Sequence, residues 1–155
     1  MEPEPTAEEF HEAAALRAAL RKFMRSSEQV AREEGLTPSR YLLLLMIKAS
    51  EGGRSNVTEL ADRMQLTQST VTELVTRAES AGLVEREQSE DDARVFWLRL
   101  SPEGQARLAR VVRRNGRERR RLLEFLDVAA ALPPPRTVGD RNASPLASSA
   151  RKRWT

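Results

Sequence analysis

The chain has 155 residues, of which 39% are hydrophobic and 5% aromatic, and it carries a formal net charge of +3. This length fits one domain with an aliphatic core, and the absence of cysteine excludes disulfides, cysteine metal ligands and thiol-based redox sensing. The acidic first ten residues lack the apolar stretch of a signal peptide. The longest apolar run, Tyr41–Ile47, is far too short to span a bilayer, so we expect a cytoplasmic protein without membrane contact.

A long helix is predicted from residue 6 to about residue 34, after a disordered start at residues 1–5. Thr6 and Glu9 form the pattern of a capping box, and Gly35 closes the helix. Apolar residues recur at helical spacing: Phe10, Ala13, Leu16, Leu20, Phe23, Met24, Val30 and Ala31. This stripe is longer than a small domain can cover, so part of it needs another partner.

The next helix begins at Thr37 and Pro38, a cap residue followed by proline at the first helical position. Its segment 41–47 is apolar almost all round, which predicts a fully buried helix at the centre of the core. Glu51-Gly52-Gly53 breaks the helical pattern behind it.

Residues 56–83 contain two short helical patterns separated by a tight break. Asn56 and Glu59 predict a capping box for the first helix, and Thr67 caps the second. Apolar residues repeat at i, i+3, i+4 and i+7 in each helix: Val57, Leu60, Ala61 and Met64, then Val71, Leu74, Val75 and Ala78. The two-residue connection forces the helices to cross steeply, which predicts a helix-turn-helix unit.

The outward face of the second helix of this unit is polar and able to hydrogen-bond. We predict that it binds DNA through Thr67, Gln68, Ser69, Thr70, Thr72, Glu73, Thr76 and Arg77. Such side chains reach base edges in a major groove, and backbone N–H groups at the helix start can bind a phosphate. The alternative is a helical hairpin inside some other fold.

Two strands are predicted directly after this unit, at about residues 83–88 and 95–100. The second places Phe96, Leu98 and Leu100 on one face, and a polar, acidic turn at residues 89–93 joins the two strands. A lone hairpin is marginal in water, so we expect the hairpin to be the wing of a winged helix.

The last predicted helix spans residues 101–132, with Ser101 as cap and Pro102 at the first helical position. At about 1.5 Å per residue it exceeds roughly 40 Å, and pairing with the first helix and with a second copy of both would bury it. Its apolar stripe is interrupted at residues 113–117, where a bend would fit.

The arginine-rich run 107–121 is either a phosphate-binding stripe or a solvated face. We favour the solvated face, opposite Glu8, Glu9 and Glu12.

Three prolines stop this helix, and residues 133–155 are rich in serine, alanine, proline and arginine. We predict a disordered tail. Its basic end, Arg151–Arg153, has two interpretations, a contact with DNA phosphates or an inert tail, and we favour the inert tail.

The order of these elements resembles the multiple antibiotic resistance regulator (MarR) family over about residues 6–127. The motifs that carry the resemblance are Leu36-Thr37-Pro38, Glu59-Leu60-Ala61, Leu66 to Thr72, Gly82 to Arg86, Asp92-Ala93-Arg94 and Leu100 to Gly104. The resemblance implies a mainly α fold, a winged helix-turn-helix with long N- and C-terminal dimerisation helices. Within residues 6–132, the DNA-binding lobe would span about 37–100 and the dimerisation helices about 6–34 and 101–132.

The resemblance also implies a homodimeric transcriptional regulator that binds a pseudo-palindromic operator in double-stranded DNA and represses a nearby gene. In such proteins the wing-tip arginine that matches Arg94 reaches the minor groove, and the aspartate that matches Asp92 supports the wing. Arginine is the side chain suited to a narrow, negative minor groove. A surface ion pair between the two residues is the alternative.

Two features depart from the family. Many relatives carry a basic residue where this chain has Glu73, which repels phosphate but could accept a hydrogen bond from cytosine. The family's usual final helix is expected to be replaced by the prolines and the tail, so the dimer would rest on the first and last long helices.

Relatives bind small aromatic or phenolic effectors between the dimer helices and the DNA-binding lobe. The candidates to line such a pocket here are Phe10, Phe23, Tyr41, Met46 and Trp97. Core packing is the alternative role for most of them.

No nucleophile motif, phosphate loop or metal-ligand cluster occurs in the sequence, and the single histidine, His11, lies near the start of the first helix. We therefore expect no enzyme, no catalytic residue, no metal and no cofactor. A third alternative is an interaction protein that has kept the fold but lost DNA binding, and the intact polar face and Arg94 argue against it.

Overall fold

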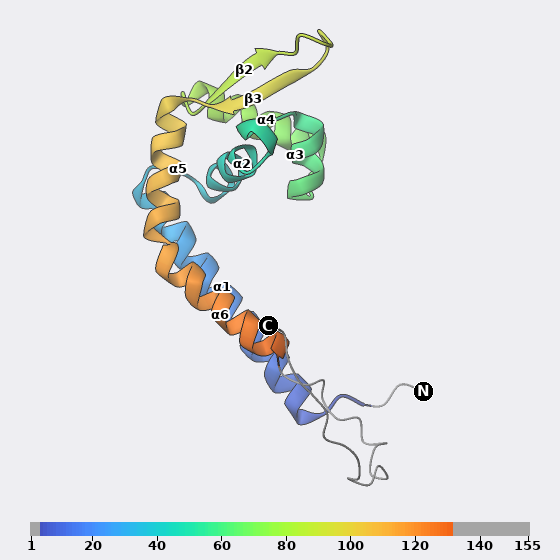
Figure 1. Ribbon diagram of the computed structural model, residues 1–155, viewed down its shortest axis with the longest axis vertical. Helices are drawn as coiled ribbons and strands as arrows, with labels where there is room; N and C mark the ends of the chain where they lie inside the picture. The colour runs from blue at the N-terminus through green and yellow to red at the C-terminus, as the bar shows by residue number, and fades with distance from the viewer. Residues whose placement is uncertain (1–3, 132–155) are drawn as a thin grey trace, which may run out of the picture.

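The computed structural model describes residues 4–131, which form a small lobe and two long helical arms (Figure 1). The lobe contains α2 (Pro38–Lys48), the short 3-10 helix η1 (Glu51–Gly53), α3 (Val57–Met64), α4 (Gln68–Ser80) and three strands. One arm is α1 (Ala7–Glu33), and the other is α5 (Pro102–Arg114) followed by α6 (Gly116–Ala131). The predicted mainly α winged-helix fold is confirmed.

The helix starts follow the predicted local chemistry. Capping boxes are present at Thr6 with Glu9 and at Asn56 with Glu59. The hydroxyl of Ser101 accepts from the backbone N–H of Gly104 at 3.0 Å, and the cap residues Thr37 and Thr67 act in the same way. Each cap satisfies a backbone donor that the helix itself leaves without a partner.

The sheet has three strands, one more than the sequence predicts. β2 (Val84–Gln88) and β3 (Phe96–Leu100) form the antiparallel wing, and β1 (Arg54–Ser55) pairs with the other edge of β3. The sheet order is β1-β3-β2, so β1 attaches the wing to the lobe along the edge of β3 that β2 leaves open.

The core is aliphatic and lies between α2, the helix-turn-helix unit and the sheet. It includes fully buried leucine, isoleucine and valine side chains: Leu36, Leu43, Leu44, Ile47, Leu60, Val71, Val75, Leu83, Leu98 and Val111. The prediction that α2 is buried all round is wrong, because Leu42 is 37% exposed and Leu45 is only partly buried. Of the residues predicted to share a face of β3, Leu98 and Leu100 are buried, whereas Phe96 is 42% exposed.

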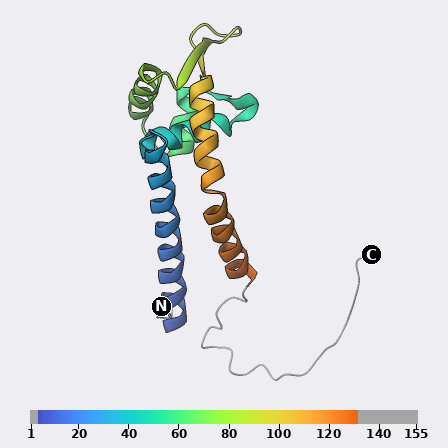
Figure 2. The same cartoon turned by 90° about the vertical axis from the view of Figure 1, so that its left-hand side faces the viewer.

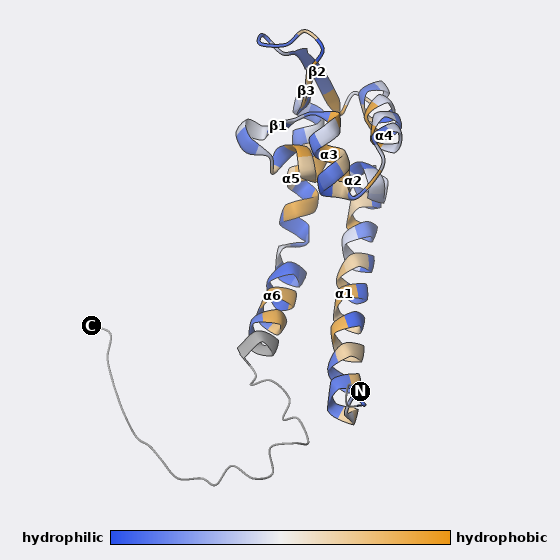
Figure 3. Ribbon diagram, turned by 90° about the vertical axis from the view of Figure 1, so that its right-hand side faces the viewer, coloured by the Kyte–Doolittle hydropathy of each residue, from blue (hydrophilic) through white to orange (hydrophobic). Residues whose placement is uncertain are grey.

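The two arms leave the same side of the lobe and run antiparallel (Figures 2 and 3). The predicted last helix is divided at Asn115, whose backbone caps α5, within the segment 113–117 where the sequence favours a bend. A separate final helix, α6, is therefore present, contrary to the expectation that the tail replaces it. The side chain of Asn115 is buried and donates to the Ser27 hydroxyl of α1 at 3.1 Å.

Ion pairs join the arms where they meet the lobe. Arg110 and Arg114 of α5 bind Glu34 at 2.6 and 3.0 Å, and Arg114 also pairs with Glu33. Arginines of this run do face acidic residues of α1, as the sequence predicts. The predicted partners Glu8, Glu9 and Glu12 are wrong, because the partners are Glu33 and Glu34. The antiparallel direction places the C-terminal end of α1, not its start, beside α5.

These contacts lower the pKa of both glutamates. The pKa of Glu33 falls through hydrogen bonds from Gln29 and then Arg114, and the pKa of Glu34 falls through hydrogen bonds from Arg110 and then Arg114. The predicted tail at residues 133–155 lies outside the described residues, as do residues 1–3.

Candidate nucleic-acid interface

The helix-turn-helix unit exposes one polar face of α4. Val71, Val75 and Ala78 are buried against the lobe, and this orientation leaves the other side of the helix in solvent. All eight residues of α4 and its cap that the sequence singles out are exposed: Thr67, Gln68, Ser69, Thr70, Thr72, Glu73, Thr76 and Arg77. The structure therefore brings these candidates together on a single surface.

The hydroxyl groups of this face are ordered by the helix itself. Thr72 donates to the carbonyl oxygen of Gln68 at 2.8 Å, and Thr76 donates to that of Thr72 at 2.9 Å. Because each hydroxyl proton is used within the helix, the oxygen lone pairs point outward as acceptors. Such acceptors suit the amino groups that adenine and cytosine present in the major groove.

At the start of α4, three hydroxyl groups cluster around the cap. The Thr67 oxygen lies 3.0 Å from the Ser69 hydroxyl and 2.8 Å from the Thr70 hydroxyl, and it accepts from the Thr70 backbone N–H. These groups are small and neutral, so they allow a nucleic-acid strand to approach the helix end closely.

Glu73 and Arg77 form an ion pair on the same face. Their atoms lie 3.4 Å apart, and the two side chains are 70% and 68% exposed. A pair this exposed contributes little to stability, so either side chain can exchange its partner for a base or a phosphate.

The wing tip is held by its own polar contacts. The carboxylate of Asp92 accepts from the backbone N–H of Arg94 at 2.9 Å, and the Gln88 amide donates to the carbonyl oxygen of Ala93 at 3.0 Å. Asp92 thus binds the wing backbone and not the Arg94 guanidinium. Among residues 4–131, Arg94 has no carboxylate partner, and its side chain is exposed.

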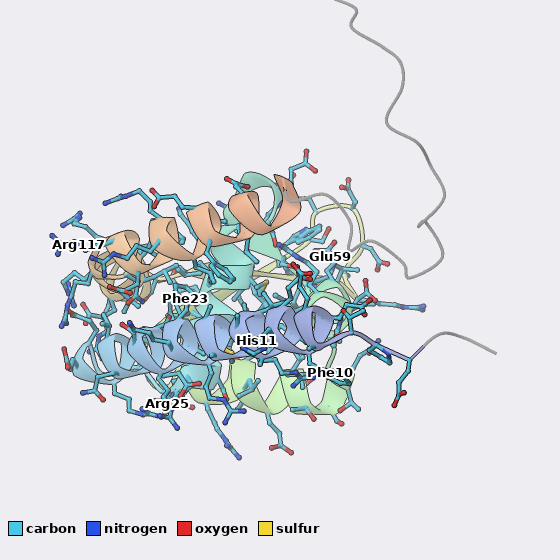
Figure 4. All side chains as sticks on the ribbon, turned by 90° about the horizontal axis from the view of Figure 1, so that it is seen from below. Phe10, His11, Phe23, Arg25, Glu59 and Arg117 are labelled. Carbon is cyan, nitrogen blue, oxygen red and sulfur yellow. The ribbon has the colours of Figure 1, made fainter. Side chains whose placement is uncertain are left out.

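The five effector-pocket candidates do not form one pocket. A cavity of about 550 Å³ between α1, α2 and α5–α6 is lined by Phe23 and Tyr41, together with Ser27, Leu42, Leu45 and Arg119. Figure 4 shows Phe23 between α1 and the other arm, whereas Phe10 lies on the opposite side of α1, where it is 63% exposed. Met46 packs against the core, and Trp97 lies beneath the Arg54 guanidinium on the sheet.

Arg119 and Ser27 line this cavity but were not predicted to do so. They are polar residues on two different arms, and the sequence spacing does not show how the arms pair. Within residues 4–131, no group of three potential metal ligands gathers. No helix of this part of the chain has the length and apolar character needed to cross a membrane.

Comparison with known proteins agrees with this geometry. A family model described as MarR family matches residues 34–95. The transcriptional repressor MdtR of Bacillus subtilis is 30% identical over 111 residues, which cover 72% of this chain and 70% of MdtR. The chain belongs to the MarR family. Because this is a family of transcriptional regulators, the prediction that the chain is not an enzyme is confirmed.

Two solved MarR-family structures support the assignment. AbsC from Streptomyces coelicolor superposes with a TM-score of 0.67 and 27% identity, covering 86% of each chain. Sco3205 from the same organism, solved in complex with DNA, has a TM-score of 0.64 and 26% identity, covering 86% of this chain and 81% of its own.

Proposed function

We propose that this MarR-family regulator binds double-stranded DNA as a homodimer, with α4 in the major groove and the wing in the adjacent minor groove. The observation that carries the proposal is the exposed polar face of α4, located beside a wing whose tip carries an arginine without a carboxylate partner among residues 4–131. Two such lobes related by a twofold axis would bind a pseudo-palindromic operator.

The apolar surface of the arms supports the dimer. Large hydrophobic side chains remain exposed along α1 and α6 in the single chain: Phe10, Leu16, Leu20, Met24, Leu123 and Phe125. Exposed apolar side chains gathered on two neighbouring helices favour an interaction site, and a second copy of the same two arms offers a matching surface.

The cavity beside Phe23 and Tyr41 is the proposed site of a small aromatic effector. It lies where both arms meet α2, so a ligand that prefers one arm–lobe arrangement would change the distance between the two α4 helices. The proposed outcome of operator binding is repression, so release of the regulator by the effector would turn the gene on.

The test is a pull-down of fragments from the source genome with the purified full chain, followed by binding of the recovered duplex at several salt concentrations. We expect one or a few sites containing an inverted repeat, bound with a steep salt dependence because phosphate contacts release counterions. Recovery of no duplex, even at low salt, would overturn the proposal.

A further inference from the structure

Two neighbouring hollows lie between the start of α4 and the wing. One hollow of about 470 Å³ lies between the first turn of α3 and the wing, and is lined by Thr58, Arg86, Arg94 and Phe96 among others. A second hollow of about 490 Å³ lies between α3 and the start of α4, where Thr58 and Gln68 line it. Thr58 borders both hollows, and we call the surface that the two hollows make on either side of Thr58 the furrow.

The position of this furrow has a consequence for DNA binding, and the inference rests on the function proposed above. A major groove and its neighbouring minor groove are separated by one sugar–phosphate strand. If α4 occupies the first groove and Arg94 the second, that strand must cross the protein between them. We propose that the furrow holds this strand and that Thr58 and Arg86 bind its phosphate.

Arg86 is oriented for this contact. Its Nε atom donates to the Glu79 carboxylate of α4 at 2.8 Å, which fixes the guanidinium between α4 and β2. Within residues 4–131, neither Nη group of Arg86 has a hydrogen-bond acceptor, and the side chain is 36% exposed. A guanidinium held on one side presents its remaining donors as a fork that fits a phosphate.

The other furrow residues suit a sugar–phosphate strand. Thr58 is exposed at the second position of α3 and supplies a neutral hydroxyl donor. The 42% exposed ring of Phe96 provides an apolar surface for a deoxyribose.

Two acidic side chains also line the furrow, Glu59 in the first hollow and Asp62 in the second. The Glu59 carboxylate accepts from the Ser55 hydroxyl at 2.8 Å and from the Asn56 backbone N–H at 3.4 Å. These bonds hold it at the α3 cap, so the phosphate position lies on the Arg86 side.

A purely structural role for Arg86 would be to hold the wing against α4 through Glu79. The two roles are separated by a matched pair of variants. Glu79→Gln removes the same ion pair but leaves the guanidinium, whereas Arg86→Gln removes the phosphate donors as well. Thr58→Val removes only a hydroxyl and tests the furrow independently of the wing.

The experiment uses the operator duplex recovered by the pull-down, with single phosphates replaced in turn by uncharged methylphosphonates. With the unchanged protein, we expect the affinity to fall by roughly fivefold or more at one or two adjacent positions of each half-site, because a charge-assisted contact is lost. Arg86→Gln and Thr58→Val should bind the native duplex more weakly and lose most of this position-specific response. Glu79→Gln, and Arg17→Ala on the distant arm, should retain it.

Three results would contradict the inference. They are no sensitive phosphate between the two grooves, an unchanged response in Arg86→Gln and Thr58→Val, or identical behaviour of Arg86→Gln and Glu79→Gln. In each case the duplex is still bound, so the furrow assignment fails while the proposed function stands. If no duplex is bound at all, the proposed function itself fails.

Discussion

The guanidinium groups of Arg94 and Arg77 occupy different electrostatic surroundings. Arg77 lies 3.4 Å from the Glu73 carboxylate, whereas Arg94 has no carboxylate partner within residues 4–131, because Asp92 binds the wing backbone. An unpaired guanidinium pays no cost of breaking an ion pair when it enters a groove, so Arg94 should contribute more to affinity than Arg77.

Replacing Arg94 by alanine tests this difference. We expect Arg94→Ala to weaken operator binding by about 1–3 kcal/mol, with the loss concentrated on duplexes whose flanks are A·T-rich, because their minor groove is narrow and negative. Fluorescence anisotropy with A·T-rich and G·C-rich flanks measures it, with Arg17→Ala as control. An unchanged affinity would remove the wing from the mechanism.

The acceptor face of α4 should determine sequence preference. We expect Gln68→Ala and Thr72→Val to alter the ranking of operator variants while leaving the slope of affinity against salt unchanged, since base contacts release no counterions. Binding to a randomised half-site library measures the ranking. A uniform loss on all sequences with a shallower salt slope would instead assign these residues to phosphates.

At the scale of elements, the junction between the arms and the lobe depends on charge and on one buried polar pair. The carboxylates of Glu33 and Glu34 have a lowered pKa in the folded chain. A lowered pKa means that the charged form stabilises the folded state. This contribution is complete above the ordinary glutamate pKa and is lost as the pH falls through the lowered value.

We expect the urea midpoint of unfolding to fall between pH 7 and pH 3. The fall should be smaller in Glu34→Gln than in the unchanged chain, because the variant lacks this carboxylate. Circular dichroism at each pH gives the midpoints, and Glu4→Gln, which lies before α1, serves as control. An equal change of the urea midpoint with pH in the unchanged chain and in Glu34→Gln would show that protonation of Glu34 does not affect stability.

At the break between α5 and α6, the side chain of Asn115 donates a buried hydrogen bond to Ser27. We expect Asn115→Ala to lower the free energy of unfolding by about 1–3 kcal/mol, because the Ser27 hydroxyl would lose its buried partner. A double-mutant cycle with Ser27→Ala in chemical denaturation should show coupling. Additive effects would mean that the pair does not stabilise the break.

The caps and the helix-turn-helix unit were predictable because their signals are local. Thr6 with Glu9 and Asn56 with Glu59 satisfy backbone donors three residues apart. β1 was not predictable, since a two-residue strand exists only through its pairing with β3. The partners of Arg110 and Arg114 depend on how the arms align, which sequence spacing does not specify.

At the scale of the whole molecule, each chain has a lobe that exposes the polar face of α4 and two arms that expose apolar side chains. In the proposed dimer the lobes bind DNA and the arms join the two chains. We expect the double variant Leu20→Glu and Met24→Glu to be monomeric in light scattering, because charges would replace side chains that are 38% and 57% exposed in the single chain. Its operator affinity should fall steeply while the lobe stays folded. A dimer of unchanged stability would place the interface elsewhere.

Hydroxyl-radical and major-groove methylation footprinting of the duplex recovered from the pull-down shows where α4 and the wing bind. We expect two protected major-groove segments centred roughly 10 base pairs, about 34 Å, apart or a multiple of that spacing, each with a protected minor groove on its outer side. Protection of a single segment, or of major grooves without the outer minor grooves, would contradict a dimer that reads DNA with α4 and the wing.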